Sequence, residues 1–232
     1  MLLFVVFFAI IIAAEGRLTD EQRSDFLNLH NEYRSLLIRG KYKNKDGKYM
    51  PHGMNMFELT WNDDLEKDAQ KRANRCWFKP LSKNGRKKIG ENVFVRWTPT
   101  GVKDFTESIV EVACKMWWSE LKEEYRDNRR NTFIADNVKK AQHFTQMAWG
   151  KTREIGCGIA SHCHDNHAFH VICHYKPRGN IPNELIYELG EPCQGDCDGG
   201  ECLGDTGLCR KQDYLNLFFH LLKKTFEMKS LI

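Results

Sequence analysis

Apolar residues recur at helical spacing in four segments of the 232-residue chain. In the first, Thr19 and Gln22 form a capping box, and the apolar positions behind them predict a helix that ends near Gly40. A second helix is expected after Asn62, with Cys76 at its end. The polar segment between these two helices is rich in Lys, Asn, Asp and Gly, which is typical of a loop.

The third predicted helix places a carboxylate on an apolar face. That face is formed by Ile109, Val112, Ala113, Met116, Trp117 and Leu121. Glu120 falls on it, and a buried carboxylate is costly unless it is hydrogen-bonded or charge-paired. We therefore expect Glu120 to have a specific partner. A fourth helix is expected to begin at His143.

Three segments read as strands, and they alternate with the helices. One runs from Ile89 to Val95, and two short apolar segments surround Cys157 and Cys173. Helices and strands interleaved by short connections indicate a mixed α/β layer structure rather than a helical bundle or a β-sandwich.

The N-terminus has the pattern of a secretory signal peptide over residues 1–16. Met1 to Ala14 is an apolar run too short to span a bilayer, and it ends in small residues before the charged Arg17. Secretion favours disulfides over metal thiolates, and nine cysteines leave at least one thiol without an internal partner. The formal net charge of +4 is scattered, so no nucleic-acid partner is expected.

The composition changes near the C-terminus. Residues 191–210 are rich in Gly and Asp and hold four cysteines, so this segment is expected to depend on its own disulfides. Residues 211–232 form an amphipathic pattern with interspersed lysines. That tail either docks on its own domain or contacts a membrane surface or a partner.

Two motifs, taken together, resemble a known superfamily. His143-Phe144-Thr145-Gln146 and the segment from Val171 to Asn180 are similar to the diagnostic segments of the cysteine-rich secretory, antigen 5 and pathogenesis-related (CAP) superfamily. The chain is most like the venom allergen-like proteins of parasitic worms. The resemblance implies a three-layer α-β-α sandwich over residues 17–190, followed by a hinge-like segment over 191–210.

The same resemblance implies a set of disulfides. They join Cys76 to Cys163, Cys157 to Cys173, Cys193 to Cys202, and Cys197 to Cys209. Cys114 is then left as a free thiol on the third helix, where it is expected to behave as a small hydrophobic residue.

Members of the family present two His and two Glu in a central cavity, sometimes with a divalent metal. Glu91, Glu120 and His143 match three of these positions, and the fourth is Pro80, which supplies no ligand. We expect the three matching residues to converge on one partly buried site. Metal binding through Glu91 and His143 is expected to be weak, with no required cofactor and no catalytic residue.

A second group of histidines surrounds Cys163. It consists of His162, His164, His167, His170 and His174. Their spacing matches no common metal site, so we interpret them as a solvated loop between two strands.

The resemblance implies a secreted, non-enzymatic protein that binds a sterol or a fatty acid in a host–parasite or defence setting. Candidate lipid-binding residues are Phe94 and Trp97, and a second candidate region lies between the helices at Phe26–Leu37 and Phe133–Trp149. Two alternatives stay open. One is a ligand of a host receptor or plasma protein, and the other is a metal-dependent hydrolase using Glu91, Glu120 and His143, against which Pro80 counts.

Overall fold

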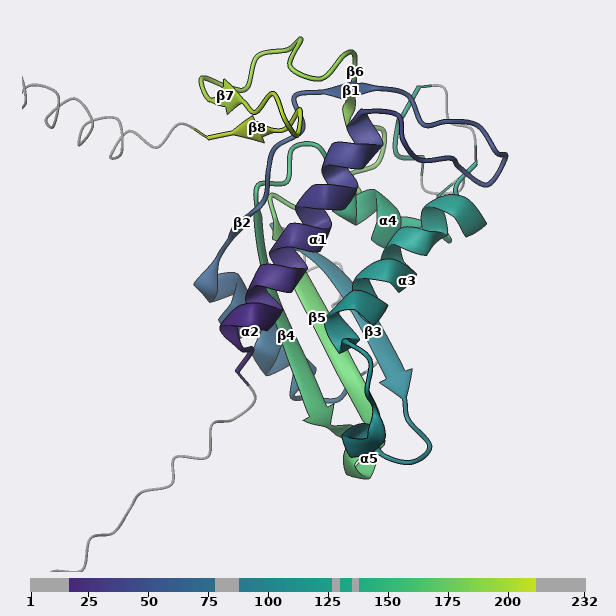
Figure 1. Ribbon diagram of the computed structural model, residues 1–232, viewed down its shortest axis with the longest axis vertical. Coiled ribbons are helices and arrows are strands. Elements are labelled where there is room, and N and C mark those ends of the chain that lie inside the picture. Colours follow the sequence, from purple (N-terminus) through teal and green to yellow (C-terminus); the bar gives the residue numbers. More distant parts are fainter. Residues whose placement is uncertain (1–16, 78–87, 127–129, 135–137, 212–232) are drawn as a thin grey trace, which may run out of the picture.

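The computed structural model describes residues 17–77, 88–126, 130–134 and 138–211 (Figure 1). The predicted signal peptide, Pro80 and the tail beyond Lys211 lie outside the described residues. Within the described residues, no helix combines the length and the apolar composition that crossing a membrane requires.

A four-stranded sheet forms the middle of the molecule, in the order β2-β4-β5-β3. Its strands are β2 (Thr60–Trp61), β3 (Gly90–Trp97), β4 (Glu154–His162) and β5 (Ala168–Lys176). β5 pairs antiparallel with both β3 and β4, while the short β2 runs parallel to β4. β3 therefore forms one edge of the sheet.

Helices cover both faces of this sheet (Figure 1). The helical elements are α1 (Asp20–Ile38), α2 (Asp63–Ala73), the 3-10 turn η1 (Val102–Asp104), α3 (Ile109–Glu123), α4 (Gln142–Met147) and the short α5 (Cys163–Asn166). α1, α3 and α4 lie on one face, and α2 lies on the other. The expected three-layer α-β-α sandwich is thus confirmed.

Local sequence signals set the helix ends. The hydroxyl of Thr19 accepts from the backbone N–H of Gln22, whose side chain accepts from the N–H of Thr19, so the capping box is present. The side chain of Asn62 accepts from two N–H groups in the first turn of α2. Each helix consequently starts where its cap predicts.

The Ile-Gly-Cys-Gly sequence of β4 lets α2 approach the sheet closely. A Cβ atom added to Gly156 would overlap the backbone N of Glu66, and one added to Gly158 would overlap Cα of Gln70. Gln70 also bonds the strand, since its amide donates to the carbonyl of Ile159 and accepts from the N–H of that residue. The two glycines are therefore required by backbone contact between helix and strand.

Two polar residues of α1, Arg34 and His30, are fully buried in the core. Arg34 is fully buried and donates to the carbonyl oxygens of Phe57, Met147, Trp149, Gly150 and Thr152. His30 is also fully buried, with its Nε2 atom 2.9 Å from the hydroxyl of Tyr175. These contacts tie α1 to the loop after α4 and to β5.

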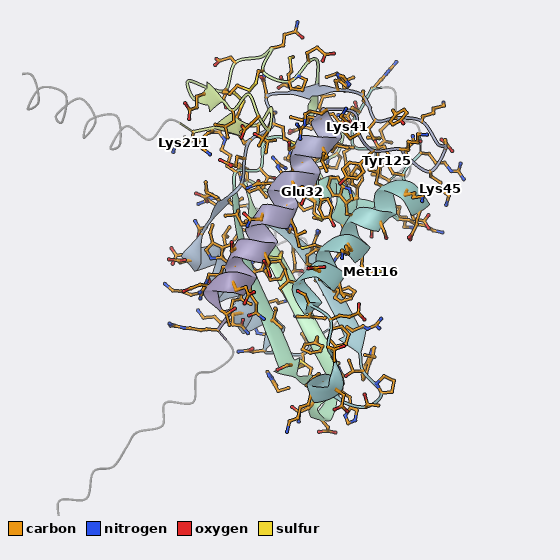
Figure 2. The ribbon with its side chains drawn as sticks, in the orientation of Figure 1. Glu32, Lys41, Lys45, Met116, Tyr125 and Lys211 are labelled. Carbon is orange, nitrogen blue, oxygen red and sulfur yellow. A yellow bond between two sulfur atoms is a disulfide. The ribbon has the colours of Figure 1, made fainter. Side chains whose placement is uncertain are left out.

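The apolar face of α3 differs from the predicted one, because Val110, Cys114 and Trp118 are buried as well, while Met116 is not. Met116 lies on the outer side of the helix (Figure 2) and is 52% exposed, so its assignment to the core was wrong. Trp118 is buried instead and stacks on Tyr33 of α1, with ring centroids 4.8 Å apart. The face rotates toward Trp118 because α3 packs against both α1 and α4.

Four disulfides are present, and Cys114 is a buried free thiol. The bonded pairs are Cys76–Cys163, Cys157–Cys173, Cys193–Cys202 and Cys197–Cys209. These are the pairs that the resemblance implies. Cys157 and Cys173 face each other across β4 and β5 in the strand register.

The hinge-like segment is anchored to the sandwich by more than its disulfides. It contains the short strands β7 (Glu201–Cys202) and β8 (Cys209–Arg210), while β1 (Gly53–Met54) pairs with β6 (Glu188–Leu189) nearby. Leu208 is fully buried in the main core, and the hydroxyl of Ser35 in α1 donates to the carbonyl of Thr206.

Candidate functional site

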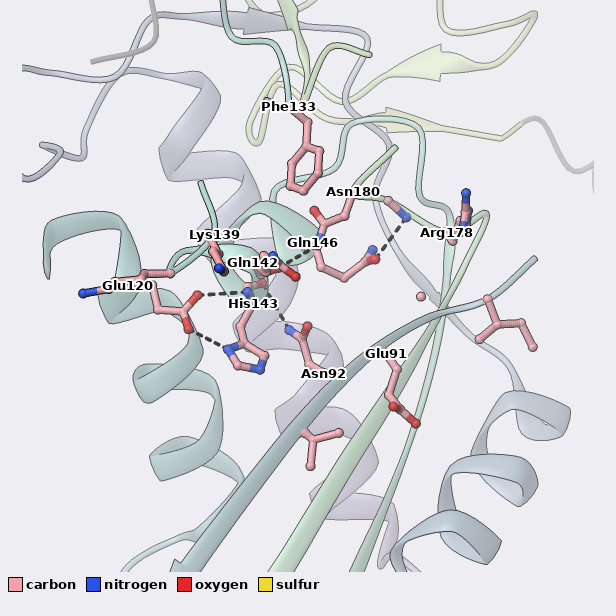
Figure 3. A pocket seen from close by; sticks show the side chains of 15 residues that line it. Glu91, Asn92, Glu120, Phe133, Lys139, Gln142, His143, Gln146, Arg178 and Asn180 are labelled. Carbon is pink, nitrogen blue, oxygen red and sulfur yellow. Dashed lines mark hydrogen bonds and ion pairs between the residues drawn. The ribbon is translucent and has the colours of Figure 1, made fainter. Parts of the chain in front are cut away.

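A cavity of about 590 Å³ lies at the first residues of β3 (Figure 3). Its walls come from β3, the C-terminal half of α3, the start of α4 and the segment after β5. Glu91, Glu120 and His143 all line it. The volume falls within the range of small-molecule sites in proteins.

Glu120 and His143 form a bonded pair in this cavity. The Nδ1 atom of His143 lies 2.5 Å from Oε1 of Glu120. The other oxygen of Glu120 accepts from the backbone N–H groups of His143 (2.9 Å) and Phe144 (3.1 Å). Glu120 therefore holds the start of α4 against α3, which explains the carboxylate on the apolar face of α3.

Glu91 does not join this pair, although it lines the same cavity. Its carboxylate lies 3.3 Å from Nε2 of His174 and 3.5 Å from Nε of Arg72 in α2. Its neighbour Asn92 points the opposite way and donates to the carbonyl of His143. Because successive side chains of a strand alternate between faces, Glu91 turns toward α2 while Asn92 turns toward α4. The predicted convergence of three residues is therefore wrong for the Glu91 carboxylate.

This donor set does not fit a resident metal ion. His143 directs Nδ1 to Glu120, which leaves Nε2 as its one remaining nitrogen. Both carboxylates already have partners in the protein, and they face opposite sides of the sheet. A zinc site normally takes three or four protein ligands around one point. Pro80, which occupies the family's second His position, lies outside the described residues.

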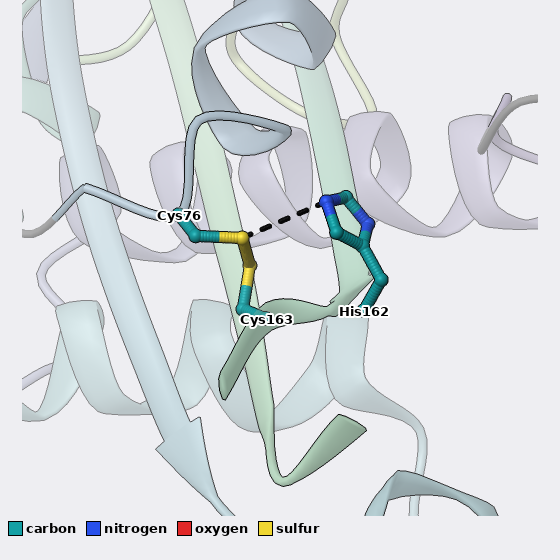
Figure 4. Close-up of side chains that lie close together, drawn as sticks. All are labelled: Cys76, His162 and Cys163. Atoms are coloured by element: carbon teal, nitrogen blue, oxygen red, sulfur yellow. Dashed lines mark hydrogen bonds between the residues drawn. A yellow bond between two sulfur atoms is a disulfide. The ribbon is translucent and has the colours of Figure 1, made fainter. Parts of the chain in front are cut away.

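A close group of Cys76, His162 and Cys163 lies at the other end of β4 (Figure 4). The Nε2 atom of His162 is 3.6 Å from the sulfur of Cys76. The two cysteines are joined to each other, so their sulfurs are not thiolates available to a metal. Among the described residues, no other group of three His, Cys, Asp or Glu side chains is spaced to hold a metal ion.

The histidines around Cys163 do not form one solvated loop. His162, His164 and His167 are exposed near the β4–β5 turn, as expected. His170 and His174 instead lie in β5 and are buried, so that part of the interpretation was wrong. Both side chains face the layer of α2, since an even number of residues separates each of them from Ala168 and Ile172, which lie on that face of the strand.

The two candidate lipid-binding residues lie on opposite faces of the sheet. Phe94 pairs in register with Val171 and packs against the main core, whereas Trp97 pairs with Ala168, and its ring lies tilted against His164 with the centroids 4.5 Å apart. Their odd separation in sequence places them on different faces of the strand. Trp97 is 52% exposed. A single groove cannot contain both side chains.

Gln146 is a cavity residue that the sequence analysis did not single out. It belongs to the His-Phe-Thr-Gln motif, and it is almost fully buried between β3 and the segment after β5. Its Oε1 atom accepts from the backbone N–H of Gly179 at 3.0 Å. The available signal was a glutamine directly before the apolar Met147 and Ala148, followed later by a Gly-Asn stop.

Comparison with known proteins finds one matching family, relatives of similar sequence and solved structures of similar fold. The profile of the family described as "CAP: Cysteine-rich secretory protein family" matches residues 27–175. Venom allergen 5.02 of Dolichovespula maculata is 33% identical over 173 residues, which cover 73% of this chain and 78% of the relative. Two solved structures are also similar. BmVAL-1 is 47% identical with a TM-score of 0.80 and covers 86% of this chain and 98% of its own. NaASP2, crystallised with Zn²⁺, is 30% identical with a TM-score of 0.73 and covers 85% of this chain and 98% of its own.

Proposed function

Because this chain belongs to the CAP family, we propose that it is a secreted, non-enzymatic binding protein that takes up a sterol or a fatty acid. Its relatives carry the names venom allergen and secreted protein, which supports an extracellular location. Residues 1–16 would then be removed as a signal peptide. N-terminal sequencing of the exported protein tests that step.

The observation that carries the lipid proposal is an apolar face at the end of the sheet. Phe94 of β3, Phe105 after η1 and Phe169 of β5 are all only partly buried and pack against the main core. The rings of Phe105 and Phe169 are 5.4 Å apart, and the guanidinium of Arg96 lies over Phe105. In Figure 1 these ends of β3 and β5 extend past α1 and α3. An aromatic surface beside a cation suits an amphipathic lipid.

The second candidate region, between the helices, supports uptake less well. Aromatic rings fill the space beside α1 and α4, where Trp118 packs on Phe144 at 5.0 Å and on Tyr33 at 4.8 Å. An acyl chain there would have to displace these packed rings, and well-packed cores resist such rearrangement.

The non-enzymatic part of the proposal rests on the hydrogen bonds and ion pairs that the carboxylates of the cavity already make. Glu120 accepts three hydrogen bonds, and Glu91 is held by Arg72 and His174. Nε2 of His143 is the cavity nitrogen left to act as a general base, but the described residues that line the cavity include no Ser, Thr or Cys that it could activate as a nucleophile. We expect esters and peptides not to be hydrolysed. In calorimetry, zinc should bind with a dissociation constant above about 1 μM, little changed by His143→Ala. Tighter binding that His143→Ala abolishes would support the hydrolase alternative.

Saturation binding to delipidated protein tests the lipid proposal, with radiolabelled cholesterol and palmitate as probes. Micromolar binding corresponds to about 8 kcal/mol, supplied mainly by apolar burial. Phe105→Ser should weaken binding by about tenfold, because a phenyl ring contributes about 1.5–3 kcal/mol when buried. Met116→Ser is the matched control, since Met116 is exposed on the far side of α3.

Two further variants locate the site. Trp97→Ser changes the opposite face of the sheet, so a loss there rather than with Phe105→Ser would move the site to Trp97. Deletion from Lys211 onward should leave binding intact. If neither cholesterol nor palmitate binds saturably, the lipid proposal is wrong, and a ligand for a host receptor or plasma protein becomes the better hypothesis.

A further inference from the structure

We propose that the cavity beside α4 binds a phosphate group, with Gln146 as the buried donor and basic side chains around the opening. The proposal goes beyond lipid uptake, because it concerns a different surface and needs no acyl chain. It rests on an amide donor without a partner, on two glycines that leave room for this amide, and on the charge of the cavity walls.

The amide of Gln146 is the first observation. The residue is 2% exposed, and its Oε1 atom is used by the N–H of Gly179. Its Nε2 atom has no hydrogen-bond partner among the described residues. A buried donor left without an acceptor costs about 1–3 kcal/mol, so such groups in folded proteins usually meet a partner. An acceptor oxygen in the cavity would supply it.

Glycines on both sides leave room for this amide. A Cβ atom added to Gly90 would overlap Oε1 of Gln146, and one added to Gly179 would lie 2.9 Å from its Nε2. Figure 3 shows the amide between these segments, close to Arg178 and Asn180. The bond from Gly179 fixes Oε1, which leaves the N–H₂ group as the part available to a ligand. Both glycines thus keep open the space that the amide occupies.

The charge of the walls favours an anion. Among the described residues, three basic ones line the cavity, namely Lys139, Lys140 and Arg178, against the two acids Glu91 and Glu120. Both acids already accept hydrogen bonds or ion pairs, Glu120 from His143 and Glu91 from Arg72, and these partners weaken their repulsion of an anion. A concave site lined mainly by one sign of charge concentrates counter-ions of the opposite sign. A cation is disfavoured, because the buried unpartnered group of Gln146 is an N–H donor, and a cation is bound by atoms with a free lone pair.

Phosphate fits this set of donors better than a carboxylate does. It offers three or four acceptor oxygens, so one oxygen can accept from Gln146 while others face the lysine ammonium groups, which are common phosphate ligands. The cavity of about 590 Å³ also has room for an organic substituent on the phosphate. The source is then either a soluble phosphate compound or the headgroup of a phospholipid.

Titration of the mature chain with inorganic phosphate tests the proposal, followed by ¹⁵N NMR of the glutamine side-chain amides. We expect saturable binding at about millimolar concentration and a shifted Gln146 amide signal. Gln146→Glu replaces the donor by an acceptor of the same shape and should weaken binding at least about tenfold. Gln142→Glu is the matched control. It adds the same charge at an exposed residue of the same cavity, so it should cost much less.

The sources are distinguished by two more probes. Equal affinity for inorganic phosphate and glycerol 3-phosphate indicates a soluble phosphate ligand, whereas much tighter binding to phosphatidic acid vesicles indicates a lipid headgroup. If Gln146→Glu fails to fold, the double variant Lys139→Ser/Lys140→Ser takes its place and should weaken binding and its salt dependence. No saturable phosphate binding, or equal losses in the Gln146 and Gln142 variants, overturns the proposal. Phe105→Ser should leave phosphate binding unchanged, which separates this result from the lipid result.

Discussion

Acidification should destabilise this protein through His30, a histidine held neutral in the core. Its Nδ1–H donates to the carbonyl of Phe26 at 2.7 Å, so Nε2 accepts from the hydroxyl of Tyr175 at 2.9 Å. Burial lowers the pKa of His30 to about 4. The hydrogen bond to the carbonyl of Phe26 raises this pKa in part, whereas the positive charge of Arg34 lowers it further. Protonation would place a second positive charge beside Arg34 in a site without a carboxylate partner for it.

The size of the effect follows from the two pKa values. The unfolded chain has the ordinary histidine pKa of 6.5, and the folded protein has a value of about 4. The folded state therefore binds fewer protons, and stability increases with pH across this interval. The contribution is fully present above pH 6.5 and is lost as the pH falls toward 4. By linkage it amounts to about 3 kcal/mol, a large part of the stability of a single domain.

Urea denaturation from about pH 7 to about pH 4 measures this contribution. His30→Gln removes the titrating group, so the variant should be less stable at neutral pH but should lose about 3 kcal/mol less than the wild type on acidification. His52→Gln is the control, because His52 is half exposed and pairs with Glu191 at the surface. Parallel pH profiles for the wild type and His30→Gln would refute the reasoning.

Three other substitutions or treatments have defined outcomes. Arg34→Met leaves several buried carbonyl oxygens without a donor, so it should lower the free energy of unfolding by about 3–5 kcal/mol in urea denaturation. Arg34→Lys should restore only part of that stability. A loss below about 1 kcal/mol in Arg34→Met would contradict this prediction. Burial raises the pKa of the Cys114 thiol, so iodoacetamide should label Cys114 only in denaturant. Label found on Cys114 of the native protein by mass spectrometry would contradict this prediction. Gly158→Ala forces α2 away from β4 and should lower the free energy of unfolding by about 1–3 kcal/mol. Gly204→Ala is the control and should leave stability unchanged, because a Cβ atom there meets no atom within 4 Å. Equal melting temperatures for the two variants would contradict the close approach of α2 to β4.

Features that depend on neighbours in sequence were predictable. The capping box at Thr19, the start of α2 after Asn62 and the strands around Cys157 and Cys173 follow from local spacing, and the structure has them. The partly buried Glu120 was also expected to have a partner, because the cost of burying a carboxylate does not depend on the fold. The opposite orientations of Phe94 and Trp97 were likewise available from strand alternation, although the sequence analysis did not use that argument.

Features that depend on which elements meet were not predictable. The side of β3 to which Glu91 turns depends on α2 bringing Arg72 to that face, and the burial of His170 depends on the same helix. Met116 and Trp118 exchange roles because α3 contacts two helices rather than one. None of these contacts can be predicted from the spacing of residues within one helix or strand.

By itself, the sequence determined the order of helices and strands, their caps, and the family to which the chain belongs, since each of these depends on residues a few positions apart. Only the tertiary structure decided what Arg34, His30 and Gln146 do. Their partners lie up to 145 residues away in sequence. A buried polar group is stable only where the fold supplies those partners, so its role is fixed by the packing of the elements and not by the segment that carries it.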